Sequence, residues 1–303
     1  MLTRIAVTGR HGQVARALTE AGPQLGVEIV PLGRPELDLA APETIGRALT
    51  AAAPNIVVNA AAYTAVDQAE REPEKANAIN ASGAGAVATS ARALGIPIIH
   101  LSTDYVFDGL KAAPYTEGDE VAPTSVYGAS KLTGERVVAA IAFDHVILRT
   151  SWVYAPYGKN FVRTMLALAQ TRDEVRVVAD QLGCPTYAPD IAVAIIAVAG
   201  NLLSKPDDPR LRGIFNLAGS EETNWADFAA TIFAILARKG MRTPVVTPIS
   251  SADYPTAARR PTNSRLDCSK LARVHRIELP SWRSSLRSCL ERLSSEVDQP
   301  FRS

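Results

Sequence analysis

Apolar strand-like runs alternate with alanine-rich helical stretches through the first half of the chain. Such alternation is typical of parallel sheets that carry helices on both faces. It predicts an α/β fold built on a Rossmann-type doubly wound parallel sheet. The expected strands are residues 5–8, 28–32, 56–59, 98–101, 146–149 and 175–178. The expected helices are residues 13–21, 42–52, 73–94 and 125–141.

The pattern becomes irregular after Trp152, with proline and glycine at 155–158 and again at 183–186. We therefore expect residues 1–150 to form a dinucleotide-binding domain and residues 151–303 to form mainly a smaller C-terminal substrate-binding lobe. Some later segments should return to the first domain, above all a strand at 214–217. Further helices are expected at 160–169, 188–203, 225–238 and 280–297.

The amino-acid composition and net charge limit the kinds of molecule that the chain is expected to bind. The 303 residues are 47% hydrophobic and carry a formal net charge of +1, so the chain lacks the basic surface that nucleic acid or an anionic membrane demands. The most apolar later stretch, 191–203, is too short to span a bilayer. Three widely spaced cysteines, at 184, 268 and 289, and a start that passes directly into the first strand indicate a cytoplasmic protein with reduced thiols.

A glycine-rich turn follows the first expected strand. Gly9 and Gly12 leave backbone N–H groups open to a pyrophosphate, which would sit at the positive end of the following helix. The spacing is Gly-x-x-Gly-x-x-Ala, with Ala15 where many dehydrogenases have a third glycine. An ordinary turn is the alternative interpretation, but the position at a strand end favours a cofactor site. His11, Gln13 and Val14 belong to the same turn.

The end of the second strand usually selects the cofactor. An acidic residue there binds a ribose 2′-hydroxyl, whereas an arginine accommodates a 2′-phosphate. Arg34 occupies this point and favours NADPH, although a solvated loop arginine is the alternative. Asp38 and Leu39 come next and can lie beside the adenine. Small residues after the third strand allow close passage of ribose and phosphates: Ala60, Ala61 and Ala62.

Tyr127 and Lys131 are four residues apart, which places them on one face of a helix, one turn from each other. The positive charge should lower the pKa of the tyrosine and make it a useful proton donor. Thr103 follows the apolar run 98–101, at a strand end where ligands of such sheets bind. Each residue also has an ordinary interpretation: a turn hydrogen bond for Thr103, a half-buried helix tyrosine for Tyr127 and a solvated lysine for Lys131.

In their joint order these features resemble the extended short-chain dehydrogenase/reductase superfamily, and within it the dTDP-4-dehydrorhamnose reductases. The resemblance is nearly full length. Its most distinctive motifs are Ser-Thr-Asp-Tyr-Val-Phe at 102–107, Arg-Thr-Ser-Trp-Val-Tyr at 149–154 and Arg-Pro-x-Asn-Ser-Arg-Leu at 260–266. The other matching stretches are residues 9–14, 57–67, 127–131 and 180–186.

The resemblance implies reduction of the C4 ketone of dTDP-4-dehydro-L-rhamnose to dTDP-L-rhamnose, with NADPH or NADH, for a surface polysaccharide. Tyr127 would donate the proton, Lys131 would hold the nicotinamide ribose, and Thr103 would bond the carbonyl oxygen. Trp152 would flank the sugar, with core packing as its alternative. The implied substrate-side residues are Thr103, Asp104, Trp152, Arg260, Asn263 and Ser264.

The resemblance also implies that three residues lie near the diphosphate: Arg260, Asn263 and Ser264. For Arg260 the alternative is a surface ion pair. Position 262 is often glycine in this family but is threonine here.

Other functions fit the residues less well. The four histidines do not stand at metal-ligand spacing, so no metal site is expected, and no glycine-flanked serine elbow supports a hydrolase. Two alternatives stay open: another nucleotide-ketosugar reductase or epimerase, and a non-catalytic regulatory subunit of the same fold. The sequence leaves a homodimer open as well.

Overall fold

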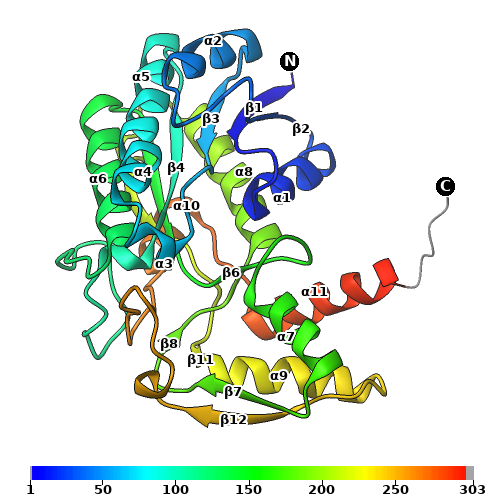
Figure 1. Cartoon of the computed structure of the whole chain (residues 1–303). Coiled ribbons are helices and arrows are strands. Elements are labelled where there is room, and N and C mark those ends of the chain that lie inside the picture. The colour runs from blue at the N-terminus through cyan, green and yellow to red at the C-terminus, as the bar shows by residue number, and fades with distance from the viewer. Residues whose placement is uncertain (1, 298–303) are drawn as a thin grey trace.

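A computed structural model describes residues 2–297 and places one parallel sheet at the centre of the first half of the chain (Figure 1). Within the described residues this sheet has six strands in the order β10-β5-β4-β3-β1-β2, and every neighbouring pair is parallel. The strands are β1 (Thr3–Thr8), β2 (Val27–Leu32), β3 (Ile56–Asn59), β4 (Ile98–Thr103), β5 (His145–Thr150) and β10 (Gly213–Asn216). The doubly wound fold expected from the sequence is confirmed.

Successive side chains of each strand point to opposite faces of the sheet, and each face has its own apolar core. Ile5 and Val7 of β1 pack with α1 and α8 on one face, whereas Ala6 packs with α2, α5 and α6 on the other. These helices are α1 (Gln13–Ala21), α2 (Glu43–Ala52), α5 (Ala84–Leu94), α6 (Val126–Ile141) and α8 (Ala188–Ser204). Burial on both faces explains why the strands are almost continuously apolar.

The helix expected at 73–94 has three parts. These are α4 (Pro73–Asn77), a wider π-helical segment η2 (Ala78–Gly83) and α5. Close packing accompanies the wider turn: a Cβ at Gly83 would lie 2.5 Å from the backbone oxygen of Leu39. The Asn80 side chain in this segment donates to the Tyr63 backbone oxygen and to Ser130 Oγ of α6. The π-helical segment therefore joins the loop after β3 to α6.

The second half of the chain forms a smaller lobe around an apolar cluster of its own (Figure 1). Its main elements are α7 (Phe161–Thr171), β7 (Glu174–Val178), α9 (Trp225–Arg238), β12 (Val245–Ile249) and α11 (Trp282–Val297). The expected strand at 175–178 exists, but its place in the main sheet was wrong, because β7 pairs in parallel with β12. The sixth strand of the main sheet is β10, the return strand that the sequence predicted.

Short elements connect these parts. They are α3 (Val66–Ala69), β6 (Val153–Tyr154), β8 (Leu182–Gly183), β9 (Thr186–Tyr187), β11 (Thr223–Asn224), α10 (Ser269–His275) and the 3₁₀ turns η1 (Pro23–Leu25), η3 (Asp104–Val106), η4 (Pro209–Leu211) and η5 (Ser251–Asp253). Because α8 and β10 belong to the sheet half, the second half of the chain contributes to both parts. Among residues 2–297, no helix combines the length and apolarity needed to cross a bilayer.

One buried ion pair ties α6 to the sheet. Arg149 of β5 donates from Nε and Nη2 to both carboxylate oxygens of Glu135, at 2.9 and 2.7 Å, and both side chains are 2% exposed. Removing one partner of such a pair leaves an uncompensated buried charge, which costs far more than loss of an exposed pair.

We predict that Arg149→Met lowers the free energy of unfolding by about 3–5 kcal/mol, because the Glu135 carboxylate loses its partner. Urea unfolding of the purified variant measures the change. Arg4→Met, which breaks an exposed pair with Glu28, is the control and should cost about 1 kcal/mol or less. Equal losses in the two variants would contradict a structural role for the buried pair.

Candidate active site

A cavity of about 600 Å³ opens at the carboxyl edge of the sheet. It lies at the ends of the paired strands β1 and β3, where the strand order reverses, because the chain proceeds from β1 to β2 on one side and then to β3 on the other. This is the switch point at which ligands of open α/β sheets bind. The lining includes every residue that the sequence assigned to the cofactor: Gly9, His11, Gly12, Gln13, Val14, Arg34, Asp38, Leu39, Ala60, Ala61, Ala62, Tyr127 and Lys131.

The glycine-rich turn forms one wall of the cavity. Gly9 has φ +92°, a conformation that a side chain would strain, and a Cβ there would lie 3.3 Å from Ala61 Cβ. No side chain caps the first turn of α1, so its backbone N–H groups stay available to an anion. The Gln13 side chain instead accepts a hydrogen bond from Asn160 Nδ2 and ties the start of α1 to the lobe.

Arg34 is exposed at the rim of this cavity, directly after β2. Arg10 also lines the cavity, but its Nη2 lies 3.0 Å from Glu36 and its Nε donates to the Pro31 backbone oxygen. Asp38 bonds locally, since its Oδ1 accepts from Ala40 N and its backbone N–H donates to a threonine hydroxyl. Arg34 is therefore the better placed of the two arginines to meet a ligand at the rim.

Tyr127 stands at the inner end of the cavity, in the first turn of α6, whose cap is the Ser125 hydroxyl. The Tyr105 ring packs edge-on against it, with ring centroids 5.5 Å apart. Burial raises the pKa of the phenol well above its usual value, while a hydrogen bond with the Thr103 side chain acts in the opposite direction. The structure thus brings Thr103 at the end of β4 and Tyr127 together.

Lys131 lines the same cavity and is 2% exposed. Its Nζ donates to the Leu101 backbone oxygen at 2.7 Å and lies 3.5 Å from His100 Nε2. Burial lowers the pKa of the ammonium to about 8, although the negative charge of Glu135 opposes this. The expectation of a lowered Tyr127 pKa was wrong for this structure, since burial raises that pKa.

Asp104 is the most unusual carboxyl of the region. It is 4% exposed, and burial raises its pKa to about 6 against the lowering effect of hydrogen bonds with Ser264 and Thr103. Its Oδ2 finds no hydrogen-bond partner among the described residues. This oxygen is thus a buried acceptor without a partner close to the Tyr127 phenol.

Arg260 and Asn263 lie on the same loop but differ in what they contact. Arg260 pairs with Asp67, and its Nη1 donates to the Tyr105 hydroxyl at 3.3 Å. Asn263 is occupied by the protein, because Nδ2 donates to the backbone oxygens of residues 111 and 113 and Oδ1 accepts from Arg265. Asn263 thus holds the loop together.

Trp152 adopts a positive φ of 48°, which is uncommon for a side chain of this size. Its ring stacks on Trp225 with centroids 3.5 Å apart and lies directly against Gly183, where a Cβ would be 2.3 Å from the ring. The indole is half-buried and joins the loop after β5 to the lobe. Core packing therefore accounts for one face of Trp152, and a substrate contact stays a prediction.

Sequence reasoning did not assign several residues that line the cavity. Ser102 and Thr150 stand at the carboxyl ends of β4 and β5, and their hydroxyls are buried with no partner in the described part of the chain. The strand-end rule that selected Thr103 applies to them as well. Lys159 comes from the irregular loop after β6, where no periodic signal marked it. The other unassigned lining residues are Arg10, Gly33, Leu37, Thr64, Ile79, Leu101, Val153 and Gly158.

The residues present fit a dinucleotide. The Gly9 turn, whose positive φ suits glycine, and the alanines of 60–62 give the close backbone approach that a pyrophosphate needs. The hydroxyls of Ser102 and Thr150, which also line the cavity, have no partner among the described residues. Among residues 2–297, no cluster of three or more metal-binding side chains is found.

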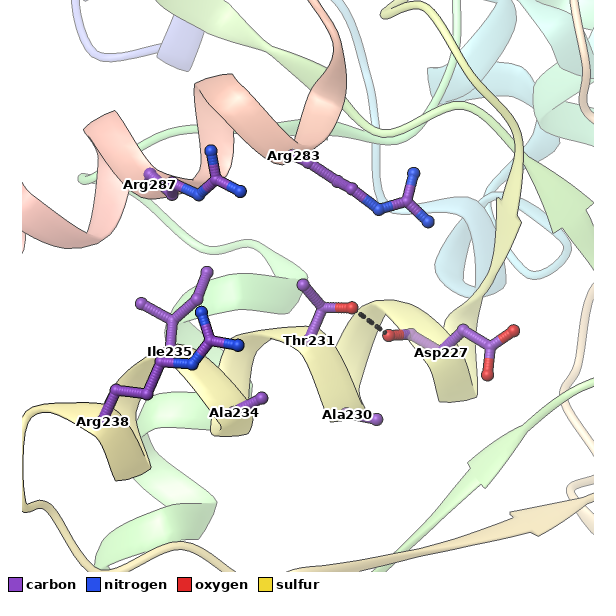
Figure 2. A pocket seen from close by; sticks show the side chains of 8 residues that line it. All are labelled: Asp227, Ala230, Thr231, Ala234, Ile235, Arg238, Arg283 and Arg287. Carbon is purple, nitrogen blue, oxygen red and sulfur yellow. Dashed lines mark hydrogen bonds between the residues drawn. The ribbon is translucent and has the colours of Figure 1, made fainter.

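A second hollow, of about 490 Å³, lies between α9 and α11 (Figure 2). Figure 2 shows that Arg238 of α9 and Arg283 and Arg287 of α11 line it, above the small residues Ala230 and Ala234. It contains no residue that the sequence assigned to a site. The cavity at the sheet edge is therefore the candidate active site.

Comparison with known proteins agrees with this geometry. The RmlD substrate binding domain family matches residues 3–295. The dTDP-4-dehydrorhamnose reductase of Sinorhizobium fredii is 55% identical over 284 residues, which cover 94% of this chain and 95% of that protein. That of Burkholderia thailandensis is 42% identical, over 97% of this chain and 100% of its own length.

A crystal structure of dTDP-4-dehydrorhamnose reductase from Bacillus anthracis in complex with NADP superposes with a TM-score of 0.89. It is 34% identical, and the match covers 96% of this chain and 100% of that one. At this similarity the likeness extends beyond the fold to the family.

Proposed function

This chain belongs to the dTDP-4-dehydrorhamnose reductase family of NAD(P)-dependent oxidoreductases, and we propose that Tyr127, Thr103 and Lys131 carry its reaction. The substrate is dTDP-4-dehydro-L-rhamnose, reduced at its C4 ketone to dTDP-L-rhamnose, with NADPH or NADH as reductant. One observation carries the assignment of roles: a buried phenol lines the same cavity as a glycine-rich turn, and the Thr103 hydroxyl, which is outside the cavity lining, is hydrogen-bonded to that phenol.

The cofactor supplies a hydride to the C4 carbon. Thr103 donates a hydrogen bond to the carbonyl oxygen and stabilises the charge that develops on it. Tyr127 then transfers its phenolic proton to that oxygen, which completes the alcohol. Because its pKa is raised by burial, the phenol is fully protonated at neutral pH, as a proton donor must be.

Lys131 binds the nicotinamide ribose hydroxyls in this proposal and keeps the cofactor close to the phenol. Arg34 binds the 2′-phosphate of NADPH, and Asp38 and Leu39 lie beside the adenine. Asp104 and Ser264 face the sugar, Trp152 flanks it, and Arg260 lies near the diphosphate. Support for these positions comes from the burial of Asp104 and its unpartnered oxygen, and from the exposed rim position of Arg34.

The loop anchor Asn263 contributes indirectly, by holding residues 111 and 113 against the substrate side. A cofactor domain of residues 1–150, a lobe formed mainly by residues 151–303 with α8 and β10 returning to the sheet, a cytoplasmic location with free thiols and a homodimer complete the proposal. Light scattering of the purified protein tests the homodimer.

The test of the overall function is a panel of nucleotide-ketosugars offered to purified protein with NADPH and with NADH. We expect NADPH oxidation with dTDP-4-dehydro-L-rhamnose, and dTDP-L-rhamnose as the product by mass spectrometry and nuclear magnetic resonance. Turnover of a different ketosugar alone would assign the chain to another reductase activity. No turnover of any ketosugar would favour the regulatory-subunit alternative.

Tyr127→Phe keeps the ring but removes the proton that the reaction needs. We expect kcat to fall by a factor on the order of 10² to 10⁴, with NADPH binding largely retained. Steady-state kinetics and a fluorescence titration with NADPH measure the two effects. Tyr63→Phe, which removes a hydroxyl bonded to Glu72, is the matched control and should keep normal turnover. Near-normal turnover of Tyr127→Phe would remove this residue from the mechanism.

Arg34→Ala should weaken NADPH on the order of tenfold and NADH much less, because only NADPH carries the 2′-phosphate. Titration of the two nucleotides against the variant measures both affinities. Arg10→Ala is the comparison, and a smaller effect is expected since Arg10 is already paired with Glu36. Equal losses for NADPH and NADH in Arg34→Ala would disprove the phosphate contact.

A further inference from the structure

A chain of buried polar side chains runs beneath the cavity from β1 to α6. Thr8 Oγ1 and Asn59 Oδ1 are 2.6 Å apart, Asn59 Nδ2 and His100 Nδ1 are 3.0 Å apart, and His100 Nε2 is 3.5 Å from Lys131 Nζ. Each of these four side chains is at most 2% exposed. The reaction roles assigned above use only Lys131, so the other three require a reason of their own.

The position of His100 beside Lys131 supplies such a reason. Lys131 Nζ has three hydrogens, and the Leu101 backbone oxygen takes one at 2.7 Å. The imidazole nitrogen is the other acceptor that the structure places beside Nζ. With two of its hydrogens directed at β4, the ammonium can direct the third into the cavity that Lys131 lines.

We propose that His100 is a positioning residue, whose Nε2 accepts a hydrogen bond from Lys131 and so aims the ammonium at the cofactor ribose. This inference rests on the proposed role of Lys131 and adds a residue that acts through it. Because a neutral imidazole has one N–H, Nδ1 carries the proton and donates to Asn59. In the structure Thr8 Oγ1 donates to Asn59 Oδ1, and Asn59 Nδ2 faces His100 Nδ1. The proposed tautomer requires the Asn59 oxygen and nitrogen to exchange places, so that Nδ2 donates to Thr8 Oγ1, which also accepts from the Ala61 backbone N–H.

The surroundings of the ring agree with a neutral acceptor. Burial and the positive charge of Lys131 hold the pKa of His100 well below its usual value, with a smaller contribution from His145 of β5. The other titratable or charged groups around this pair are Tyr127 and Glu135 on α6 and Arg149 on β5, which pairs with Glu135. A neutral ring accepts from the ammonium without repelling it.

Two polar variants separate positioning from simple packing. The amide of His100→Gln reaches the place of Nε2, whereas the amide of His100→Asn reaches only that of Nδ1. The Gln variant therefore keeps the contact with Lys131 and loses the contact with Asn59. The Asn variant keeps the contact with Asn59 and loses the contact with Lys131. Both side chains are polar, so neither leaves an apolar gap in the network.

The measurement is the affinity for NADPH by calorimetry across pH. For the natural protein, affinity should fall as pH rises through the Lys131 pKa of about 8, because the charged form binds the ribose. His100→Asn should weaken NADPH on the order of tenfold and move this fall to lower pH by about one unit, since the ammonium loses an acceptor. His100→Gln should stay within about threefold and keep the fall in place.

Equal behaviour of the two variants, or a milder effect of Asn than of Gln, would overturn the inference and leave His100 a packing residue. Lys131→Met distinguishes this from failure of the proposed function. If Lys131→Met binds NADPH normally, the role of the lysine itself is wrong. If it binds NADPH weakly while His100→Asn does not, only the role of His100 is wrong.

Discussion

The close approach of α6 to the backbone beneath it fixes the geometry of the site. A Cβ at Gly128 would lie 2.2 Å from the Tyr105 backbone oxygen, and a Cβ at Gly134 would lie 2.1 Å from that of Asn80. These contacts permit no side chain, so glycine at both positions sets the depth of the helix. Tyr127 and Lys131 lie between or beside these two contacts, and their positions therefore follow from backbone packing.

Sequence reasoning located the parts of the site that depend on local geometry. A glycine turn at a strand end, small residues after β3 and the hydroxyl of Thr103 at the end of β4 all carry a local signal, and all lie at one edge of the sheet because parallel strands end together. Long-range pairing carries no such signal. Residues 175–178 were apolar enough to predict a strand, but only the tertiary structure pairs that strand with β12. Asn263 likewise bonds backbone oxygens about 150 residues away.

The direction of the Lys131 side chain was also beyond the sequence. Spacing by four residues predicted that Lys131 and Tyr127 share a helix face, and both do line the cavity. Spacing cannot report that a backbone oxygen of β4 and an imidazole draw Nζ toward the sheet. Burial has the largest effect on the pKa of the Tyr127 phenol, which therefore rises. The nearby positive charge of Lys131 alone had predicted a lower pKa.

The raised pKa of Tyr127 differs from the lowered value expected from the sequence, and it keeps the phenol protonated at neutral pH. The oxygen that accepts the proton becomes an alkoxide-like centre as hydride arrives, and such a centre is more basic than a phenolate. The transfer proposed for Tyr127 therefore starts from a protonated phenol, while the same raised pKa makes that phenol a weaker acid. Lys131, with a pKa of about 8, is about nine-tenths charged at pH 7. Burial therefore favours the protonated, neutral form of Tyr127 and works against the charged form of Lys131, which is nevertheless mostly charged at pH 7.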